Sequence, residues 1–157
     1  MKRSLGAAMA ALLSAASAGA QAPPPPAPAP VTERIGSIVL NGKALPFSNA
    51  VLAGDTVYLS GQVGLKADGT LPAGFEAQAR QTMNNIGAVL KSAGLGWGDV
   101  VKCTVMLDNI ADWPAFNPVY ASYFPDGKFP ARSALGADGL ALGALLEVEC
   151  LAYAPRR

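Results

Sequence analysis

Apolar side chains recur along the middle of the chain with two different spacings. Between residues 74 and 93 they return every three or four positions, as on one face of a helix, and Gly94 follows as a stop signal. The same spacing predicts a second helix over residues 113 to 124. Between residues 101 and 108 every second residue is apolar, which predicts a long strand with one face in the core. That face consists of Val101, Cys103, Val105 and Leu107.

Shorter strand signals lie on both sides of this central part. Residues 35 to 40 look like a strand that runs into Asn41-Gly42, the strongest two-residue hairpin signal. Strand and turn signals alternate from residue 47 to residue 63, and two closing strands are expected over residues 129 to 135 and 144 to 153. The order β-β-β-α-β-α-β-β predicts an α+β domain, with a single sheet covered by helices on one face.

The first thirty residues have a different character. Two basic residues precede an uncharged run rich in Ala and Leu, which ends in Ala18-Gly19-Ala20, a small-x-small cleavage pattern. This predicts a signal peptide over residues 1 to 20, cut near Ala20, and a periplasmic or secreted bacterial protein with no stable membrane insertion after cleavage. An uncleaved membrane anchor is the alternative. Residues 21 to 33 are expected to be a Pro- and Ala-rich spacer or a PxxP ligand, which leaves residues 34 to 157 for the domain.

The composition of the chain excludes several kinds of catalytic and binding site. The chain has 157 residues, of which 51% are hydrophobic and 15% charged, so one domain can bury a core without a metal or disulfide. Histidine is absent, which excludes histidine-activated nucleophiles, histidine-ligated zinc and a histidine general base. The net charge of +1, without a basic run, disfavours a nucleic-acid partner.

Arg132 is the first candidate for a functional side chain. It places a permanently charged guanidinium among apolar neighbours in the segment Phe129-Pro130-Ala131-Arg132-Ser133. A guanidinium in such a setting is suited to bidentate capture of a carboxylate. A structural salt bridge to a glutamate on the neighbouring strand is the alternative.

Two acidic residues and two cysteines complete the candidates. Glu147 and Glu149 lie two positions apart on one face of a strand, so one of them could be an acid or base with a raised pKa, or both could be ordinary solvated or ion-paired groups. Cys103 and Cys150 are an even pair in a chain predicted to be exported, which permits a disulfide. Two buried free thiols fit the same pattern.

Six segments, in their order and spacing, resemble the Rid proteins, the reactive intermediate deaminases also called RidA or YjgF-like. The resemblance extends from about residue 46 to residue 154. It implies a chorismate-mutase-like fold, with one mixed sheet and two helices packed on one face, that assembles as a homotrimer with ligand clefts between subunits. It also implies hydrolysis of 2-imino acids or their enamine tautomers, of the 2-iminobutanoate and 2-iminopropanoate type, to 2-oxo acids and ammonia without a cofactor or a metal. The segments are Ser60-Gly61-Gln62 and residues 78 to 85, 99 to 105, 116 to 120, 129 to 133 and 146 to 149.

The resemblance also implies roles for single residues. The family's carboxylate-binding arginine falls on Arg132, and its water-orienting or proton-shuttling glutamate falls on Glu147. The same comparison places Ser60 and Gly61 along the cleft, with Asn117 supporting it from the second helix.

At two positions the sequence departs from the family pattern. Phe47 stands where active deaminases carry a tyrosine, so one hydrogen bond to ligand or water, worth about 1 kcal/mol, is missing. Ala134 stands where a cysteine often follows the Arg-Ser pair. These departures leave a second hypothesis open, a non-catalytic trimeric module that binds a small carboxylate in the periplasm. A ribonuclease or chaperone role is disfavoured by the absence of histidine and by the near-neutral charge.

Overall fold

The computed structural model describes residues 32–40 and 42–155. The predicted signal peptide over residues 1 to 20, most of the predicted spacer and Asn41 lie outside the described residues. No helix within the described ranges is long and apolar enough to cross a membrane.

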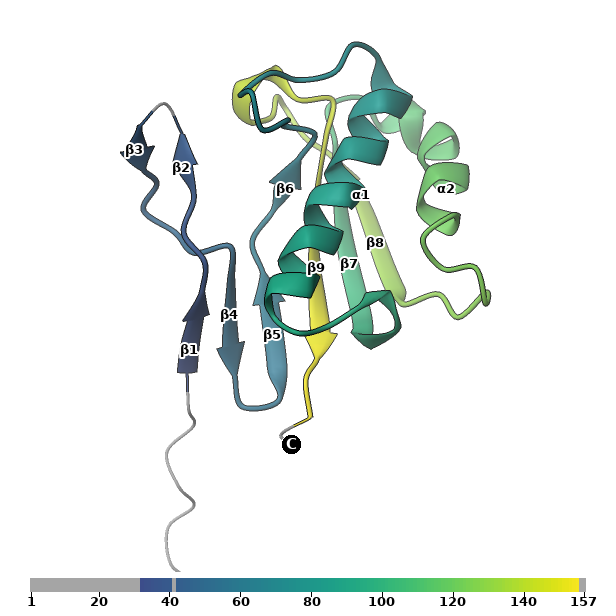
Figure 1. The fold of residues 1–157 in the computed structure, drawn as a ribbon. Coiled ribbons are helices and arrows are strands. Elements are labelled where there is room, and N and C mark those ends of the chain that lie inside the picture. Colours follow the sequence, from purple (N-terminus) through teal and green to yellow (C-terminus); the bar gives the residue numbers. More distant parts are fainter. Residues whose placement is uncertain (1–31, 41, 156–157) are drawn as a thin grey trace, which may run out of the picture.

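The domain is built on one seven-stranded sheet with the strand order β1-β4-β5-β9-β7-β8, in which β6 also pairs with β9 (Figure 1). Strands β7 and β8 run parallel and the other pairs of this sheet are antiparallel, which confirms the mixed sheet. Strands β2 and β3 form a separate hairpin at the position of the predicted turn. The strands are β1 (Thr32–Ile35), β2 (Val39–Leu40), β3 (Lys43–Ala44), β4 (Ala50–Ala53), β5 (Thr56–Leu59), β6 (Gln62–Val63), β7 (Val100–Leu107), β8 (Ala131–Gly136) and β9 (Leu146–Tyr153).

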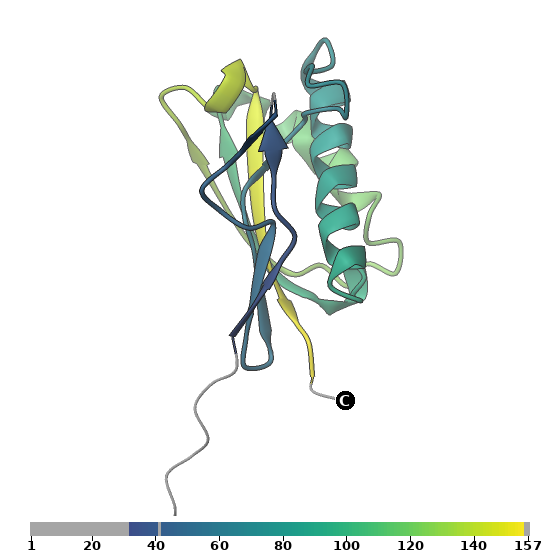
Figure 2. The same cartoon turned by 60° about the vertical axis from the view of Figure 1, so that its left-hand side comes forward.

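Both predicted helices are present, and both lie on the same face of the sheet, as the turned view in Figure 2 shows. Helix α1 (Phe75–Ser92) agrees with the prediction to within one residue at each end. Helix α2 (Trp113–Ala121) ends three residues before the predicted end, because its last turn continues in shorter 3₁₀-type hydrogen bonds such as the one from Tyr123 N to Tyr120 O. The core between helices and sheet includes Ala79, Met83, Ile86, Leu90, Phe116, Val119, Val105 and Val148.

Two strand predictions need correction. Val101 was expected on the core face of its strand, but its side chain is 49% exposed. A register shift between Val100 and Lys102, opposite β9, inserts an extra residue and puts Val100 in the core instead. The strand expected over residues 35 to 40 is broken at Gly36, whose φ of 66° is incompatible with extended backbone. Strand β1 therefore lies earlier, and its first residue, Thr32, falls within the segment predicted to be spacer.

The second face of the main sheet is not covered by any helix of the described chain, and we call it the open face (Figure 2). Side chains alternate along β7 and β9, so the residues between the buried ones point to this face. They include Tyr58, Thr104, Met106, Leu135, Glu147, Glu149 and Tyr153.

Cys103 and Cys150 are directly opposite each other on β7 and β9, and they are joined as a disulfide in the buried core. Of the two alternatives left by the sequence, the structure has the disulfide. The bond closes a loop of 47 residues in sequence and ties together the two central strands.

Removing this disulfide is expected to lower the free energy of unfolding by about 3 kcal/mol, because the cross-link restricts the unfolded chain. The measurement is urea unfolding of the wild type with and without dithiothreitol, beside a Cys103→Ala, Cys150→Ala double variant. The reduced wild type and the double variant should both unfold at lower urea concentration. A wild-type midpoint that does not respond to reductant would mean that the two thiols are free.

Candidate functional site

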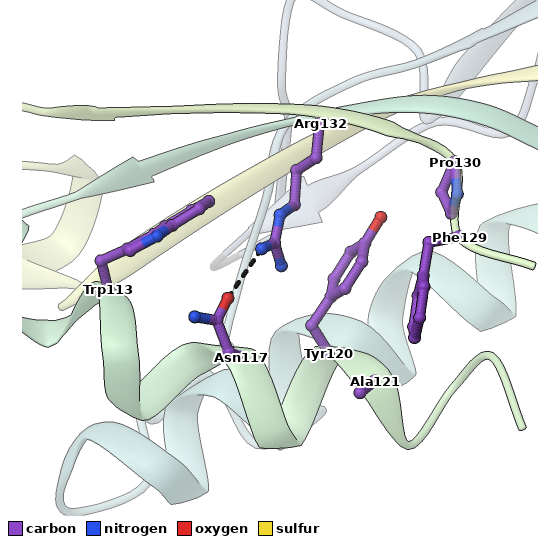
Figure 3. A pocket seen from close by; sticks show the side chains of 7 residues that line it. All are labelled: Trp113, Asn117, Tyr120, Ala121, Phe129, Pro130 and Arg132. Carbon is purple, nitrogen blue, oxygen red and sulfur yellow. Dashed lines mark hydrogen bonds between the residues drawn. The ribbon is translucent and has the colours of Figure 1, made fainter. Parts of the chain in front are cut away.

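Arg132 lies on β8, at the edge of the main sheet. Its register partner on the parallel strand β7 is Cys103, whose side chain is in the core, so Arg132 projects from the helix-covered face toward α2. Helix α2 meets it with one side of its surface, because Trp113, Asn117 and Tyr120 are spaced by four and three residues. Figure 3 shows these three side chains pointing at the guanidinium.

The guanidinium of Arg132 is held from three directions. Its Nη2 donates a hydrogen bond of 2.7 Å to Asn117 Oδ1. Its central carbon lies 4.3 Å from the ring centroid of Trp113 and 4.4 Å from that of Tyr120, so the cation sits between two aromatic rings (Figure 3). Burial lowers the pKa of Arg132 from its usual value, but an arginine remains charged at neutral pH.

No carboxylate of the described residues lies within 4.0 Å of Arg132. The structural salt bridge that the sequence left open as an alternative is therefore wrong for residues 32–40 and 42–155. Glu147 and Glu149 cannot supply it within one chain, because they lie on the open face. A partly buried cation without an acidic partner favours an anionic ligand.

Arg132 is the one charged side chain lining a cavity of about 440 Å³ beside α2. The other lining residues provide rings, an amide and small apolar groups, so the cavity combines a cation with mostly apolar walls. They are Trp113, Asn117, Tyr120, Ala121, Phe129 and Pro130 (Figure 3).

Ala134 follows Arg132 on the same face of β8 and lines a neighbouring apolar groove of about 540 Å³. Trp113 lines both the cavity and this groove, so the indole forms part of the boundary between them. The resemblance also implied that Ala134 and Phe47 are substrate-binding positions, and this stays a prediction.

Glu147 belongs to a second cluster, on the open face. Its carboxylate lies directly over Gly61, where a Cβ atom would collide with Glu147 Oε1. Gly61 is therefore required for this close approach. Burial raises the pKa of Glu147 above its usual value, and the nearby charge of Glu149 raises it further.

Ser60 precedes Gly61 of this second cluster, and its hydrogen bonds reach the segment that carries Phe47. Ser60 Oγ donates a hydrogen bond of 2.7 Å to Ser48 O, and Ser60 N donates one of 2.9 Å to Asn49 O. These bonds fix the segment that carries Phe47 next to the end of β5. The ring of Phe47 is 47% exposed, so it is available to a ligand or to another chain.

The predicted site residues thus form two groups within one chain. Arg132, Asn117 and Ala134 lie on the helix-covered side, whereas Glu147 and Gly61 lie on the open side. One chain does not bring Arg132 and Glu147 together.

Trp113 and Tyr120 were not predicted to be site residues. Their helical spacing with Asn117 was a usable signal, but aromatic residues at that spacing also form ordinary core, as Phe116 does here. For metals, the described residues contain no group of three or more His, Cys, Asp or Glu side chains that could hold an ion.

A mixed sheet with both helices on one face defines an α+β domain of the chorismate-mutase-like class. A sequence profile of the family described as Endoribonuclease L-PSP matches residues 41–154, and the chain belongs to this family, the Rid (YjgF/L-PSP) family. The 2-iminobutanoate/2-iminopropanoate deaminase of Capra hircus is 45% identical over 109 residues, which are 68% of this chain and 79% of that relative. The human protein of the same name is 41% identical, with the same coverage.

Solved structures support the same assignment. The YjgF gene product from E. coli matches with a TM-score of 0.70 at 32% identity, over 80% of this chain and 99% of that chain. RidA from an Antarctic Psychrobacter matches with a TM-score of 0.66 at 38% identity, over 69% and 88% of the two chains. The fold and family predicted from the sequence are therefore confirmed.

Proposed function

We propose that the protein is an imine deaminase that hydrolyses 2-imino acids, of the 2-iminobutanoate and 2-iminopropanoate type, to 2-oxo acids and ammonia. The observation that carries the proposal is the guanidinium of Arg132, which lines a cavity and has no carboxylate partner in the described chain. The names of the relatives from Capra hircus and human support the reaction type.

In this proposal the two clusters of side chains divide the reaction between them. Arg132 binds the substrate carboxylate and holds the adjacent C=N carbon in place. Glu147 orients a water molecule and accepts its proton as the water oxygen bonds to that carbon. The nitrogen takes up that proton from Glu147 and then the proton of the new hydroxyl group, the C–N bond breaks, and ammonia leaves as the carbonyl of the 2-oxo acid forms. No cofactor or metal is needed for these steps.

We further infer that the working unit is a homotrimer, with each site formed between two copies. Arg132 and Glu147 lie on opposite faces of the sheet, so a site that uses both must take them from different chains. The open face carries exposed apolar side chains that another copy could bury, among them Tyr58, Leu135 and Tyr153. Both observations support an interface at this face.

We also propose that the protein works in the periplasm or outside the cell. The predicted signal peptide over residues 1 to 20 supports this location. The disulfide between Cys103 and Cys150 supports it independently, because such bonds persist in oxidising compartments.

The test is release of 2-oxo acid and ammonia from imines made in situ by an amino-acid oxidase. The domain beginning at residue 32 should release both faster than the spontaneous reaction, and light scattering should give the mass of a trimer. Arg80→Met is a matched control, since Arg80 is an exposed arginine paired with Glu76 on α1. A folded trimer without turnover would replace the deaminase by the non-catalytic carboxylate-binding module.

A further inference from the structure

Trp113 packs against the edge of the hydrophobic core and also faces the guanidinium of Arg132. It starts α2, is only partly buried, and lines both the Arg132 cavity and the apolar groove. The central carbon of the Arg132 guanidinium lies 4.3 Å from the indole centroid. Tyr120 faces the guanidinium from the other side at 4.4 Å (Figure 3).

Two rings beside a guanidinium limit how an anion can reach it. Trp113 and Tyr120 occupy two sides of the group, so a ligand must approach from a side that they leave open, where N–H donors remain available. The hydrogen bond to Asn117 occupies one donor, and it is the one hydrogen bond that the Arg132 side chain makes with described residues. An in-plane approach is the geometry of a bidentate carboxylate.

We infer that Trp113 and Tyr120 are positioning residues, whose rings hold the guanidinium of Arg132 edge-on to the carboxylate of the ligand. The inference rests on the proposed function for the nature of the ligand. It assigns the two aromatic residues a role in affinity, acting through Arg132 and not on the reacting carbon.

The hydroxyl of Tyr120 is not required for this role. It is buried and has no hydrogen-bond partner among the described residues. Burial raises the pKa of Tyr120 to about 12, so the ring stays neutral and does not compete with an anion. Tyr120→Phe keeps the ring and should therefore retain most of the affinity that Tyr120→Ala loses.

The first experiment compares Trp113→Ala with Trp113→Phe. Pyruvate, the product expected from 2-iminopropanoate, is the binding probe. Trp113→Ala should raise the Kd for pyruvate and the KM for the imine about 10-fold, as expected for loss of one desolvated cation–π contact. Its kcat should change little, because the carboxylate is bound equally in ground and transition states. Trp113→Phe should recover most of the affinity.

A purely structural role for Trp113 would give a different result, namely a lower melting temperature with KM unchanged in the folded fraction. That result, or a Trp113→Ala variant that binds pyruvate like the wild type, would overturn the inference. Tyr120→Phe with wild-type affinity would agree with a role for the ring. A large loss of affinity in Tyr120→Phe would contradict it, since the hydroxyl would then be the active group.

A second experiment measures ligand binding at the site through the fluorescence of Trp113, without turnover. The chain has two tryptophans, so Trp97→Phe leaves Trp113 as the single one. Pyruvate should change its fluorescence in a saturable way, and the change should disappear when Arg132→Met is added. This experiment separates the positioning role of Trp113 from the assignment of the protein as an imine deaminase. A response without deaminase turnover keeps the positioning role and removes the enzyme assignment, whereas turnover without a response removes only the positioning role.

Discussion

Arg132→Met is expected to lower kcat/KM for imine hydrolysis about 10³-fold, because two charge-assisted hydrogen bonds to the substrate carboxylate are lost. Methionine keeps the aliphatic part of the side chain and removes the guanidinium, which has no carboxylate partner among the described residues, so the domain should remain folded. The measurement is steady-state turnover of imines generated in situ, with melting temperature as the check on folding.

Arg132→Lys refines this result. Lysine retains the positive charge but not the planar fork, so it should restore only part of the activity. Arg80→Met should leave kcat/KM unchanged, since the Arg80 side chain is exposed and bonded to Glu76. If Arg132→Met hydrolysed imines at the wild-type rate, the carboxylate would be bound elsewhere and the proposed site would be wrong.

The helices and most strands could be predicted because the spacing of apolar residues within each segment shows its periodicity. Helix α1 repeats its apolar residues over five turns, and its observed bounds differ from the expected ones by one residue. Val101 was misplaced because a β-bulge changes the parity of a strand without leaving a mark in the local pattern. Gly36 broke the first strand for a related reason, since its positive φ interrupts the extended backbone between β1 and β2 without leaving a mark in the apolar pattern.

The site was predictable in part. The residue pattern alone made Arg132 and Glu147 candidates, and the resemblance to the Rid proteins gave roles to them and to Asn117. The structure brings Arg132 and Asn117 into contact. Trp113 and Tyr120 were not found, because helical spacing shows that residues share a face but not what that face meets. Only the placement of α2 against the edge strand β8 turns this face toward a cavity.

The separation of Arg132 from Glu147 depends on register. Side chains on neighbouring strands share a face only according to how the strands are paired, and a shift of one residue reverses the face. The pairs Cys103 with Arg132 and Met106 with Glu147 put the two side chains on opposite sides of the sheet. The sequence pattern does not specify which residues pair across neighbouring strands. The placement of Arg132 and Glu147 on opposite faces was therefore known only from the structure.

Glu147→Gln is expected to lower kcat about 10³-fold, because an amide cannot accept the proton of the attacking water. The variant should be at least as stable as the wild type. Burial raises the folded-state pKa of Glu147 above its unfolded value, so its ionised form opposes folding at neutral pH, and glutamine removes this cost. A loss of activity together with an unchanged or higher melting temperature would therefore identify a chemical role.

The pH dependence follows from the same shift. The proposed base must be ionised, so the wild-type rate should fall as the pH drops through the raised pKa of Glu147. The fall should begin at a higher pH than an ordinary glutamate would give.

Gly61→Ala tests whether the position of the Glu147 carboxylate matters, because the added methyl group must displace that carboxylate. It should reduce kcat while leaving the carboxylate group itself intact.

Mixing the two inactive variants tests whether the site is shared between chains. In trimers assembled from equal amounts of Arg132→Met and Glu147→Gln, about a quarter of the clefts receive a native Arg132 from one copy and a native Glu147 from its neighbour. Activity should therefore return after the variants are unfolded and refolded together, but not when they are only mixed as finished trimers. If both side chains acted within one copy, refolding together would restore nothing. The opposite faces on which the sheet holds Arg132 and Glu147 make recovery the expected outcome.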